Sequence, residues 1–342
     1  MTADPRPGRK NKECAYVPVL TYAKALDQAL IEEMDRDDSV FVCGEEVAKW
    51  GGSFTVSMGL LDRFGEKRVR DTPISEEGIV GLGIGAAMAG LKPVVEIMTI
   101  NFILLAMDQI VNHMAKFRYM SGGQVTVPLV IRTPGGGRLQ MGSQHSQSLE
   151  SMFVHVPGLV VMAPSTPYDA KGMLKSAIRG NNPVLFIEHE SIYNTKSEVP
   201  DEEYFIPIGK ADVKRKGSDI TIIAHLRMLH VALEAAKRLE AEHGISAEVI
   251  DPRTLVPLDK PTLLMSVKKT GKAVIVQECW PHCSIGTDIA YTIMSEAFDY
   301  LDAPVKVISS APCPFPYSRQ LEQLALPRPE TVVDAVKQMM GR

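Results

Sequence analysis

Apolar runs of strand length alternate with longer stretches of helical periodicity along most of the chain. In the first half, the strand-like runs are 39–44, 94–99, 128–132, 159–164 and 183–188. The stretches with helical spacing are 21–34, 102–120 and 168–179. Buried strands that are separated by helices are typical of a parallel sheet covered on both faces. The first half is therefore predicted to be a doubly wound α/β domain.

The alternation breaks at residues 197–217, which combine charged residues with Pro200 and Pro207. We interpret this segment as an inter-domain connection. Beyond it, strands are expected at 220–225, 246–251, 272–278 and 305–309, with a helix that ends at Gly244 and helices near 286–300 and 329–340. The pattern predicts two doubly wound α/β domains, at 17–200 and 201–342. Residues 1–16 are polar and are expected to form a flexible arm.

Composition narrows the classes of protein that fit. With 342 residues the chain can bury two cores, and its net charge of −4 provides no basic field for nucleic acid. No apolar run reaches the roughly 20 residues that a membrane span needs. The five cysteines are scattered, which favours free thiols in a reducing compartment. We expect a bacterial cytoplasmic protein, with a processed organellar protein as the alternative.

The glycine-rich segment 81–86 has the spacing of a dinucleotide-binding loop but a different context. Such a loop follows a strand directly and opens a helix. Here Ser75 is placed as a helix N-cap followed by two acidic residues, so Gly81 and Gly85 fall inside the helix. Small residues four apart would let another backbone approach closely. The segment is therefore not expected to bind NAD.

The acidic start of this helix indicates a different chemistry. Carboxylates there repel phosphate, whereas a desolvated carboxylate can share a proton with a heterocyclic nitrogen. Glu76 and Glu77 are neighbours, about 100° apart around a helix. Only one of them can face a crevice, and the pattern alone does not choose between them.

Several motifs resemble, in order, the beta subunits of the 2-oxo acid dehydrogenase first component. They are DTPISE at 71–76, EIMTINF at 96–102, FRYMSGG at 117–123, QHSQ at 144–147, AIRGNNP at 177–183, WP at 280–281, LDAP at 301–304 and PFPY at 314–317. The resemblance spans nearly the whole chain from about Val17. It implies a domain that binds the pyrimidine of thiamine diphosphate, followed by a transketolase-type C-terminal domain.

The resemblance also implies roles for individual residues. Glu76, rather than Glu77, would hydrogen-bond the aminopyrimidine ring of thiamine diphosphate, and Phe102 would stack on that ring. His145 lies in a loop-like stretch after three glycines and would be the catalytic histidine in acyl transfer. Four further positions match residues that line the pocket, although ordinary packing is an equal alternative for each: Glu45, Ile74, Ser75 and Met98.

Two metal sites follow from the same resemblance. A structural potassium ion would be held by backbone carbonyls of Leu129, Ala177, Ile178, Gly180 and Asn182, although relatives often carry aspartate where this chain has Gly180. Relatives bind the diphosphate and its magnesium through a Gly-Asp-Gly segment, and this sequence contains none. Magnesium is therefore expected on an alpha subunit, in an α2β2 heterotetramer that passes its acyl group to a dihydrolipoyl acyltransferase.

Pyruvate is the substrate we expect, because segments 120–123 and 144–147 resemble pyruvate enzymes more than branched-chain enzymes. Acetoin and branched-chain 2-oxo acid dehydrogenases are the alternatives. A non-catalytic module of the same fold is disfavoured because Glu76, Phe102 and His145 are all present. A single-chain transketolase-like enzyme is disfavoured because the diphosphate half is missing.

Overall fold

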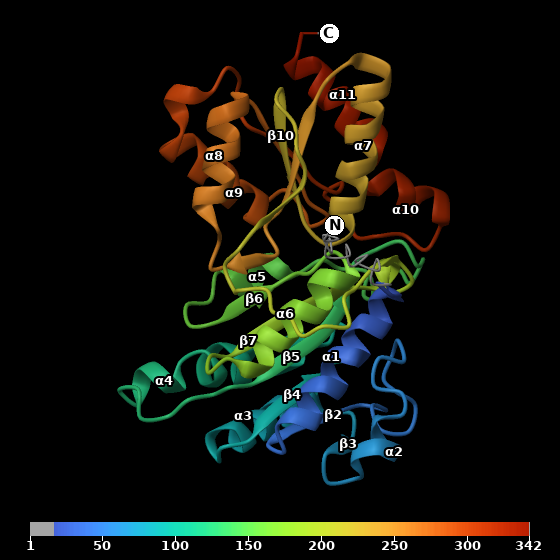
Figure 1. Ribbon diagram of the computed structural model, residues 1–342, viewed down its shortest axis with the longest axis vertical. Helices are drawn as coiled ribbons and strands as arrows, with labels where there is room; N and C mark the ends of the chain where they lie inside the picture. Colours follow the sequence, from blue (N-terminus) through green and yellow to red (C-terminus); the bar gives the residue numbers. More distant parts are fainter. Residues whose placement is uncertain (1–16, 342) are drawn as a thin grey trace, which may run out of the picture.

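The protein, described by a computed structural model over residues 17–341, has two α/β halves stacked along its long axis (Figure 1). Each half contains a central sheet with helices on both faces, which confirms the predicted fold class. The arm expected at 1–16 lies outside the described residues. None of the helices described in 17–341 combines the length and apolarity that a membrane crossing requires.

The first half is built on a seven-stranded sheet. Its strands, in spatial order, are β12 (Thr254–Val256), β6 (Val160–Met162), β7 (Val184–His189), β5 (Val130–Gly135), β4 (Lys92–Glu96), β2 (Val40–Gly44) and β3 (Val69–Asp71). The helices of this half are α1 (Tyr22–Arg36), α2 (Leu60–Phe64), α3 (Glu76–Met88), α4 (Phe117–Met120), α5 (Glu150–Val154) and α6 (Pro167–Arg179). Helices α1 and α6 pack together over one face (Figure 1). The expected strands are thus confirmed, because continuous apolar runs are buried on both faces.

The second half has a five-stranded sheet in the order β14, β13, β10, β11, β9. These strands are β14 (Lys306–Ile308), β13 (Ala273–Val276), β10 (Ile220–Ala224), β11 (Ala247–Asp251) and β9 (Asp212–Arg215). The helices are α7 (Arg227–His243), α8 (Lys260–Thr270), α9 (Ile285–Glu296), α10 (Arg319–Ala325) and α11 (Pro329–Met339). Helices α7 and α11 lie on one face and α8 and α9 on the other (Figure 1).

Short antiparallel strands were missed by the sequence pattern. β9 lies inside the segment interpreted as a connection and pairs with β11. β8 (Lys196–Glu198) pairs with β1 (Val19–Thr21). β12 belongs to the second half by sequence, yet it pairs antiparallel with β6 of the first half. Edge strands of three or four residues are too short to show a period, so their pairing depends on tertiary contacts.

The prediction of one continuous helix at 102–120 is wrong. The chain instead forms a 3₁₀-helix at Ile103–Ala106, a π-helix at Gln109–Met114 and then α4. The Ala115 N–H donates to the Ile110 carbonyl at 3.0 Å, one residue wider than in an α-helix. The backbone at Gly158 presses on this turn, since a Cβ there would lie 2.1 Å from the Ala115 carbonyl oxygen. This contact is between distant parts of the chain, and periodicity does not encode it.

The start of α3 was placed correctly at Ser75, but the Ser75 side chain makes no capping hydrogen bond. Helix α3 packs closely on the sheet at Gly83, where a Cβ would lie 2.9 Å from the Val95 side chain. A Cβ at Gly85 would meet no atom of residues 17–341 outside its own helix within 4 Å. The approach of another backbone at Gly81 and Gly85 therefore stays a prediction.

Candidate active site

The candidate residues converge at one edge of the first sheet. Strands β3, β2, β4 and β5 are parallel neighbours, so their carboxyl ends meet along this edge. Glu45 follows β2, Glu76 follows β3, Phe102 follows β4 and His145 lies in the loop after β5. In open α/β sheets, ligands bind outside the carboxyl ends of the strands. The sequence candidates are therefore placed where such a fold holds a ligand.

Two carboxylates lie close together at this edge. Glu45 is 7% exposed and Glu76 is 4% exposed, whereas Glu77 is exposed. Burial raises the pKa of Glu45, and the negative charge of Glu76 raises it further. A buried pair of like charges favours retention of a proton. The pair can therefore hold a proton and pass it to a basic nitrogen.

Phe102 and His145 form an aromatic contact beside these carboxylates. Their ring centroids are 5.3 Å apart and the rings meet edge to face at 84°. Both side chains are half-buried. The two loops that carry them are joined, because the side-chain carbonyl of Asn101 accepts hydrogen bonds from the Gln147 backbone at 3.1 Å and from its side chain at 3.0 Å. Sequence reasoning missed this positioning role of Asn101, although its place beside Phe102 was a signal.

The remaining predicted lining residues differ in placement. Met98 is half-buried, and its carbonyl accepts a hydrogen bond from the Ser53 hydroxyl at 3.3 Å. Ser75 is exposed and Ile74 is 82% exposed. The structure therefore places Met98 within the edge that holds Glu45 and Glu76, and leaves Ile74 and Ser75 at its outer surface.

A buried charge network beneath the site was missed entirely. Arg132 is 1% exposed and donates two hydrogen bonds to Glu188, at 2.7 and 2.8 Å, and one to Glu96 at 2.9 Å. The Tyr193 hydroxyl donates to Glu188 at 2.5 Å. The network ties β4, β5 and β7 together below the loops that carry Phe102 and His145. Each of these three strands contributes one charged residue to the network, and one charged residue in an apolar run does not indicate which other strand its partner lies on.

The residues expected to hold potassium lie at the opposite edge of the sheet. Leu129 precedes β5, Asn182 precedes β7, and the other three are in the last turn and cap of α6. The Leu129 carbonyl already accepts from the Val184 N–H at 2.9 Å and the Ala177 carbonyl from the Gly180 N–H at 3.2 Å. A carbonyl has a second lone pair, so these bonds leave room for an ion.

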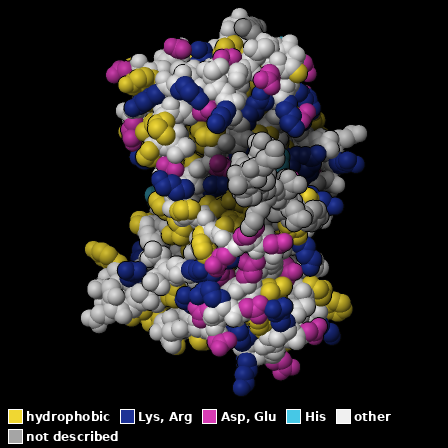
Figure 2. Space-filling model, viewed as in Figure 1, with side chains coloured by type: hydrophobic (Ala, Val, Ile, Leu, Met, Phe, Trp, Pro, Cys, Tyr) yellow, Lys and Arg dark blue, Asp and Glu magenta, His cyan; other side chains and the backbone are white. Residues whose placement is uncertain are grey.

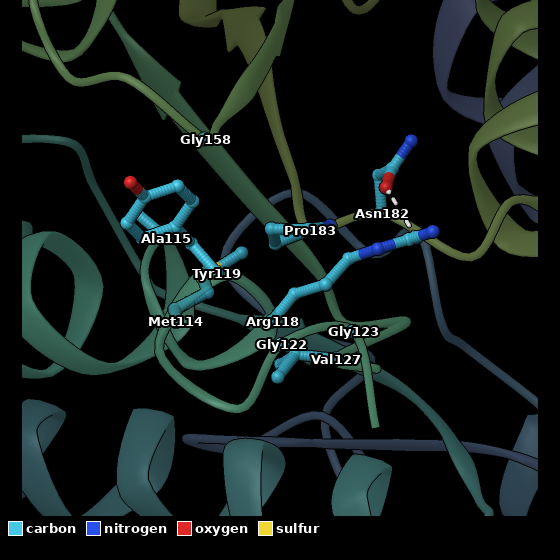
Figure 3. A pocket seen from close by; sticks show the side chains of 10 residues that line it. All are labelled: Met114, Ala115, Arg118, Tyr119, Gly122, Gly123, Val127, Gly158, Asn182 and Pro183. Carbon is cyan, nitrogen blue, oxygen red and sulfur yellow. Dashed lines mark hydrogen bonds between the residues drawn. The ribbon is translucent and has the colours of Figure 1, made fainter. Parts of the chain in front are cut away.

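Beside these residues lies a surface pocket of about 470 Å³ (Figure 3). Figure 3 shows the Arg118 side chain extended toward Asn182, whose side-chain carbonyl accepts its hydrogen bond at 3.1 Å. The lining residues include Met114, Tyr119 and Pro183, and none of the candidate active-site residues. This pocket is thus separate from the carboxyl edge where Glu76 lies.

Comparisons with known proteins agree with this geometry. The transketolase pyrimidine-binding domain family matches residues 19–196, and the transketolase C-terminal domain family matches 209–332. A pyruvate dehydrogenase E1 component subunit beta from Rickettsia bellii is 48% identical over 94% of this chain and 98% of the relative. The chain belongs to the family of these E1 beta subunits. The Rhizobium meliloti subunit is 50% identical over 93% of this chain and 69% of its own length.

The E1 beta family also includes a mitochondrial subunit from Saccharomyces cerevisiae, 46% identical over 94% of this chain and 89% of the relative. Among solved structures, the inactive β4 tetramer of a split-gene transketolase has a TM-score of 0.77 at 23% identity. It covers 94% of this chain and 98% of its own, and it shows the same fold.

Membership of the E1 beta family implies thiamine diphosphate as cofactor, and the residues present suit its pyrimidine ring. A buried carboxylate pair, Glu45 and Glu76, can bind a ring nitrogen through a shared proton. Phe102 offers an aromatic face at the same edge. Carboxylates do not suit a diphosphate, so this edge fits the pyrimidine end of the cofactor only.

Proposed function

We propose that this chain is the beta subunit of a thiamine-diphosphate-dependent pyruvate dehydrogenase that transfers the acetyl group to lipoyl-lysine. The observation that carries the proposal is the convergence of Glu45, Glu76, Phe102 and His145 at the carboxyl ends of four adjacent parallel strands. Bound thiamine diphosphate supplies the electron sink for decarboxylation. Acetoin dehydrogenase and branched-chain 2-oxo acid dehydrogenase beta subunits are the alternatives.

Each side chain then has one task. Glu76 hydrogen-bonds a pyrimidine ring nitrogen, and Glu45, whose pKa is raised by burial and by the charge of Glu76, lies beside it. Phe102 stacks on the ring and holds the edge of the His145 imidazole. His145 donates the proton that the lipoyl sulfur takes up when the lipoyl disulfide opens during acyl transfer. Met98, Ile74 and Ser75 line the rim.

The second half of the site belongs to a partner chain in this proposal. An alpha subunit supplies the diphosphate and magnesium ligands in an α2β2 heterotetramer, and Ile74, which is 82% exposed here, is covered by it. Potassium binds carbonyls of Leu129, Ala177, Ile178, Gly180 and Asn182 as a structural ion. A dihydrolipoyl acyltransferase receives the acetyl group.

Co-expression with the alpha subunit of the same organism tests the proposal. The purified complex is assayed with pyruvate, acetoin and a branched-chain 2-oxo acid, with an artificial electron acceptor in each case. We expect the highest kcat/KM for pyruvate. A preference for acetoin or the branched acid would transfer the assignment to that enzyme, and no turnover of any of the three would refute the enzymatic role.

A further inference from the structure

The loop at 136–148 carries His145, and most of its hydrogen bonds to other segments go to the second half of the molecule. Its base is closed within the first half, since the Gly136 N–H donates to the Gln147 carbonyl at 3.0 Å. Most of the hydrogen bonds that the loop makes to other segments go to two buried carboxylates of the transketolase C-terminal-type half, Glu278 and Glu322. The Ser143 hydroxyl also donates to the Phe315 carbonyl at 3.1 Å.

Glu278 follows β13 and contacts both ends of the loop. Its carboxylate accepts from the Gly137 N–H at 2.6 Å and from the Ser148 hydroxyl at 3.2 Å. The ring of His189, at the end of β7, donates to the same carboxylate at 3.1 Å. Burial alone would raise the pKa of Glu278, but the charge of His189 and these hydrogen bonds hold it below its ordinary value. Glu278 is thus ionised and fully paired.

Glu322 lies in α10, has no exposed surface, and contacts the tip of the loop. It accepts from the Arg138 N–H at 2.8 Å, the Gln140 N–H at 3.3 Å and the Gln140 side chain at 2.9 Å. Arg138 and Gln140 have φ values of 97° and 56°, in the left-handed region that non-glycine residues rarely adopt. Such strain costs about 1–3 kcal/mol per residue and persists only where surrounding contacts over-determine it.

We propose that Glu278 and Glu322 are positioning residues that fix the backbone of this loop, so that the His145 ring stays against Phe102. The inference rests on the proposed function in one respect, namely that His145 acts in acyl transfer. Its physical basis is that the loop adopts a strained backbone whose N–H groups converge on two buried carboxylates. Neither glutamate touches the reacting atoms, so both act through the loop.

Glu322→Gln in the complex with the alpha subunit tests this role. The change keeps the side-chain shape but replaces the charged carboxylate with a neutral amide, so that the Arg138 and Gln140 N–H groups lose a charged acceptor and an N–H₂ group faces the Gln140 side chain. Because small displacements far from the chemistry can cost about 10²-fold, we expect reductive acetylation of lipoamide to fall by roughly 10- to 100-fold. Decarboxylation with an artificial acceptor should change far less. Amide hydrogen exchange at Arg138 and Gln140 should become faster.

Glu248→Gln is the matched control, because Glu248 is another buried glutamate of the same half that accepts from the Ser266 hydroxyl at 2.5 Å and does not touch the loop. It should leave the ratio of the two half-reactions unchanged. Equal loss of both half-reactions in Glu322→Gln, or unchanged exchange at Arg138 and Gln140, would overturn the positioning role.

Hydrogen exchange on the unaltered complex separates this inference from the proposed function and does not depend on the folding of a variant. Protected amides at Gly137, Arg138 and Gln140 are expected whatever the substrate. If these amides exchange as fast as unstructured ones, Glu278 and Glu322 do not fix the loop, even when pyruvate is turned over. If they are protected and pyruvate is not turned over, the proposed function fails while the fixing of the loop by the two glutamates is supported.

Discussion

Two adjacent glutamates at the start of α3 have different surroundings, and the role proposed for Glu76 depends on this difference. Glu76 is 4% exposed and faces Glu45, whereas Glu77 points to solvent. Figure 2 shows Lys and Arg side chains interspersed with Asp and Glu on one face of the molecule. Glu76 is therefore shielded from water in a way that these solvated groups are not, and its charge raises the pKa of Glu45.

Glu76→Gln should fold normally and lose most pyruvate turnover in the complex with the alpha subunit. An amide cannot cycle a proton with the pyrimidine, and general acid–base contributions amount to about 10²–10⁴-fold. Steady-state kinetics with an artificial electron acceptor measure the loss. Glu77→Gln, at the exposed neighbouring residue, is the control and should change turnover only slightly. Near-normal turnover in Glu76→Gln would rule out its assigned role.

His145→Ala should retain cofactor binding and fail mainly in acyl transfer to lipoamide. The imidazole donates a proton in that step, while its contact with Phe102 is only an edge-to-face packing contact. Comparing the lipoamide reaction with decarboxylation alone measures the effect, expected at about 10²-fold or more on the former. A change in thermal stability with both reactions intact would make His145 a structural residue.

At the scale of elements, the tight turn after β5 depends on one glycine. Gly136 has φ of 94°, and a Cβ there would lie 2.2 Å from the His189 ring nitrogen. Gly136→Ala should lower the free energy of unfolding by about 2 kcal/mol or more, from backbone strain and the clash together. Gly137→Ala is the control, since its Cβ would meet Leu326 at an ordinary 3.5 Å. Urea denaturation compares the two, and equal effects would contradict this account.

The elements that could be predicted from the sequence are those whose burial is continuous. Except for β3, β9 and β12, the strands of the two large sheets appear as apolar runs. Helix α6 begins and ends near the expected residues, and α7 ends where expected. The stretch 102–120 could not be predicted, because it is divided into 3₁₀, π and α turns, and Ala115, just after the π turn, lies against the backbone of Gly158, far along the chain. Long-range packing overrides local period there.

The candidate site was predictable only in part, and for a related reason. Glu76, Phe102 and His145 came from motifs that resemble a family, whereas the choice of Glu76 over Glu77 has no basis in helical period. Glu278 and Glu322 were missed because a lone carboxylate after a strand or in a short helix has the same local sequence whether it is solvated or buried. The backbone N–H groups that they accept from, at Gly137 and Arg138, lie 141 and 184 residues away along the chain.

On the scale of the whole molecule, buried histidine–glutamate contacts join the two halves. His189 contacts Glu278 at 3.1 Å, and His225 contacts Glu150 at 3.2 Å. Separating the halves would break both contacts and expose a hydrophobic core cluster that includes residues of both halves, such as Phe153 and Ile285. The halves are therefore expected to move as one body.

The pair between His189 and Glu278 should make stability depend on pH. Burial alone would lower the pKa of His189, but the negative charge of Glu278 outweighs it and raises that pKa above the ordinary 6.5. Its contribution is complete below pH 6.5 and is lost as pH rises through the raised value. The pKa of Glu278 is held below 4.5, so its contribution is lost as pH falls through the lowered value.

His189→Gln should therefore lower the Tm of the protein most between pH 4.5 and 6.5, where both contributions are present. The difference from the unaltered protein should shrink toward alkaline pH. Calorimetric unfolding across the pH range measures it, with the exposed His155→Gln as control. A difference that does not vary with pH would show that this ion pair is not ionised as described.

If the cofactor site is divided between two chains as proposed, this chain alone lacks the diphosphate ligands. The isolated chain should bind thiamine diphosphate very weakly, and magnesium should not help, because the carboxyl edge offers carboxylates rather than diphosphate ligands. Adding the alpha subunit should give tight, magnesium-dependent binding. Potassium should raise the Tm of the isolated chain if the carbonyls near Leu129 and Asn182 bind it, through mass action. Titration calorimetry decides the first point, and tight magnesium-dependent binding without a partner would mean that this chain has its own diphosphate site.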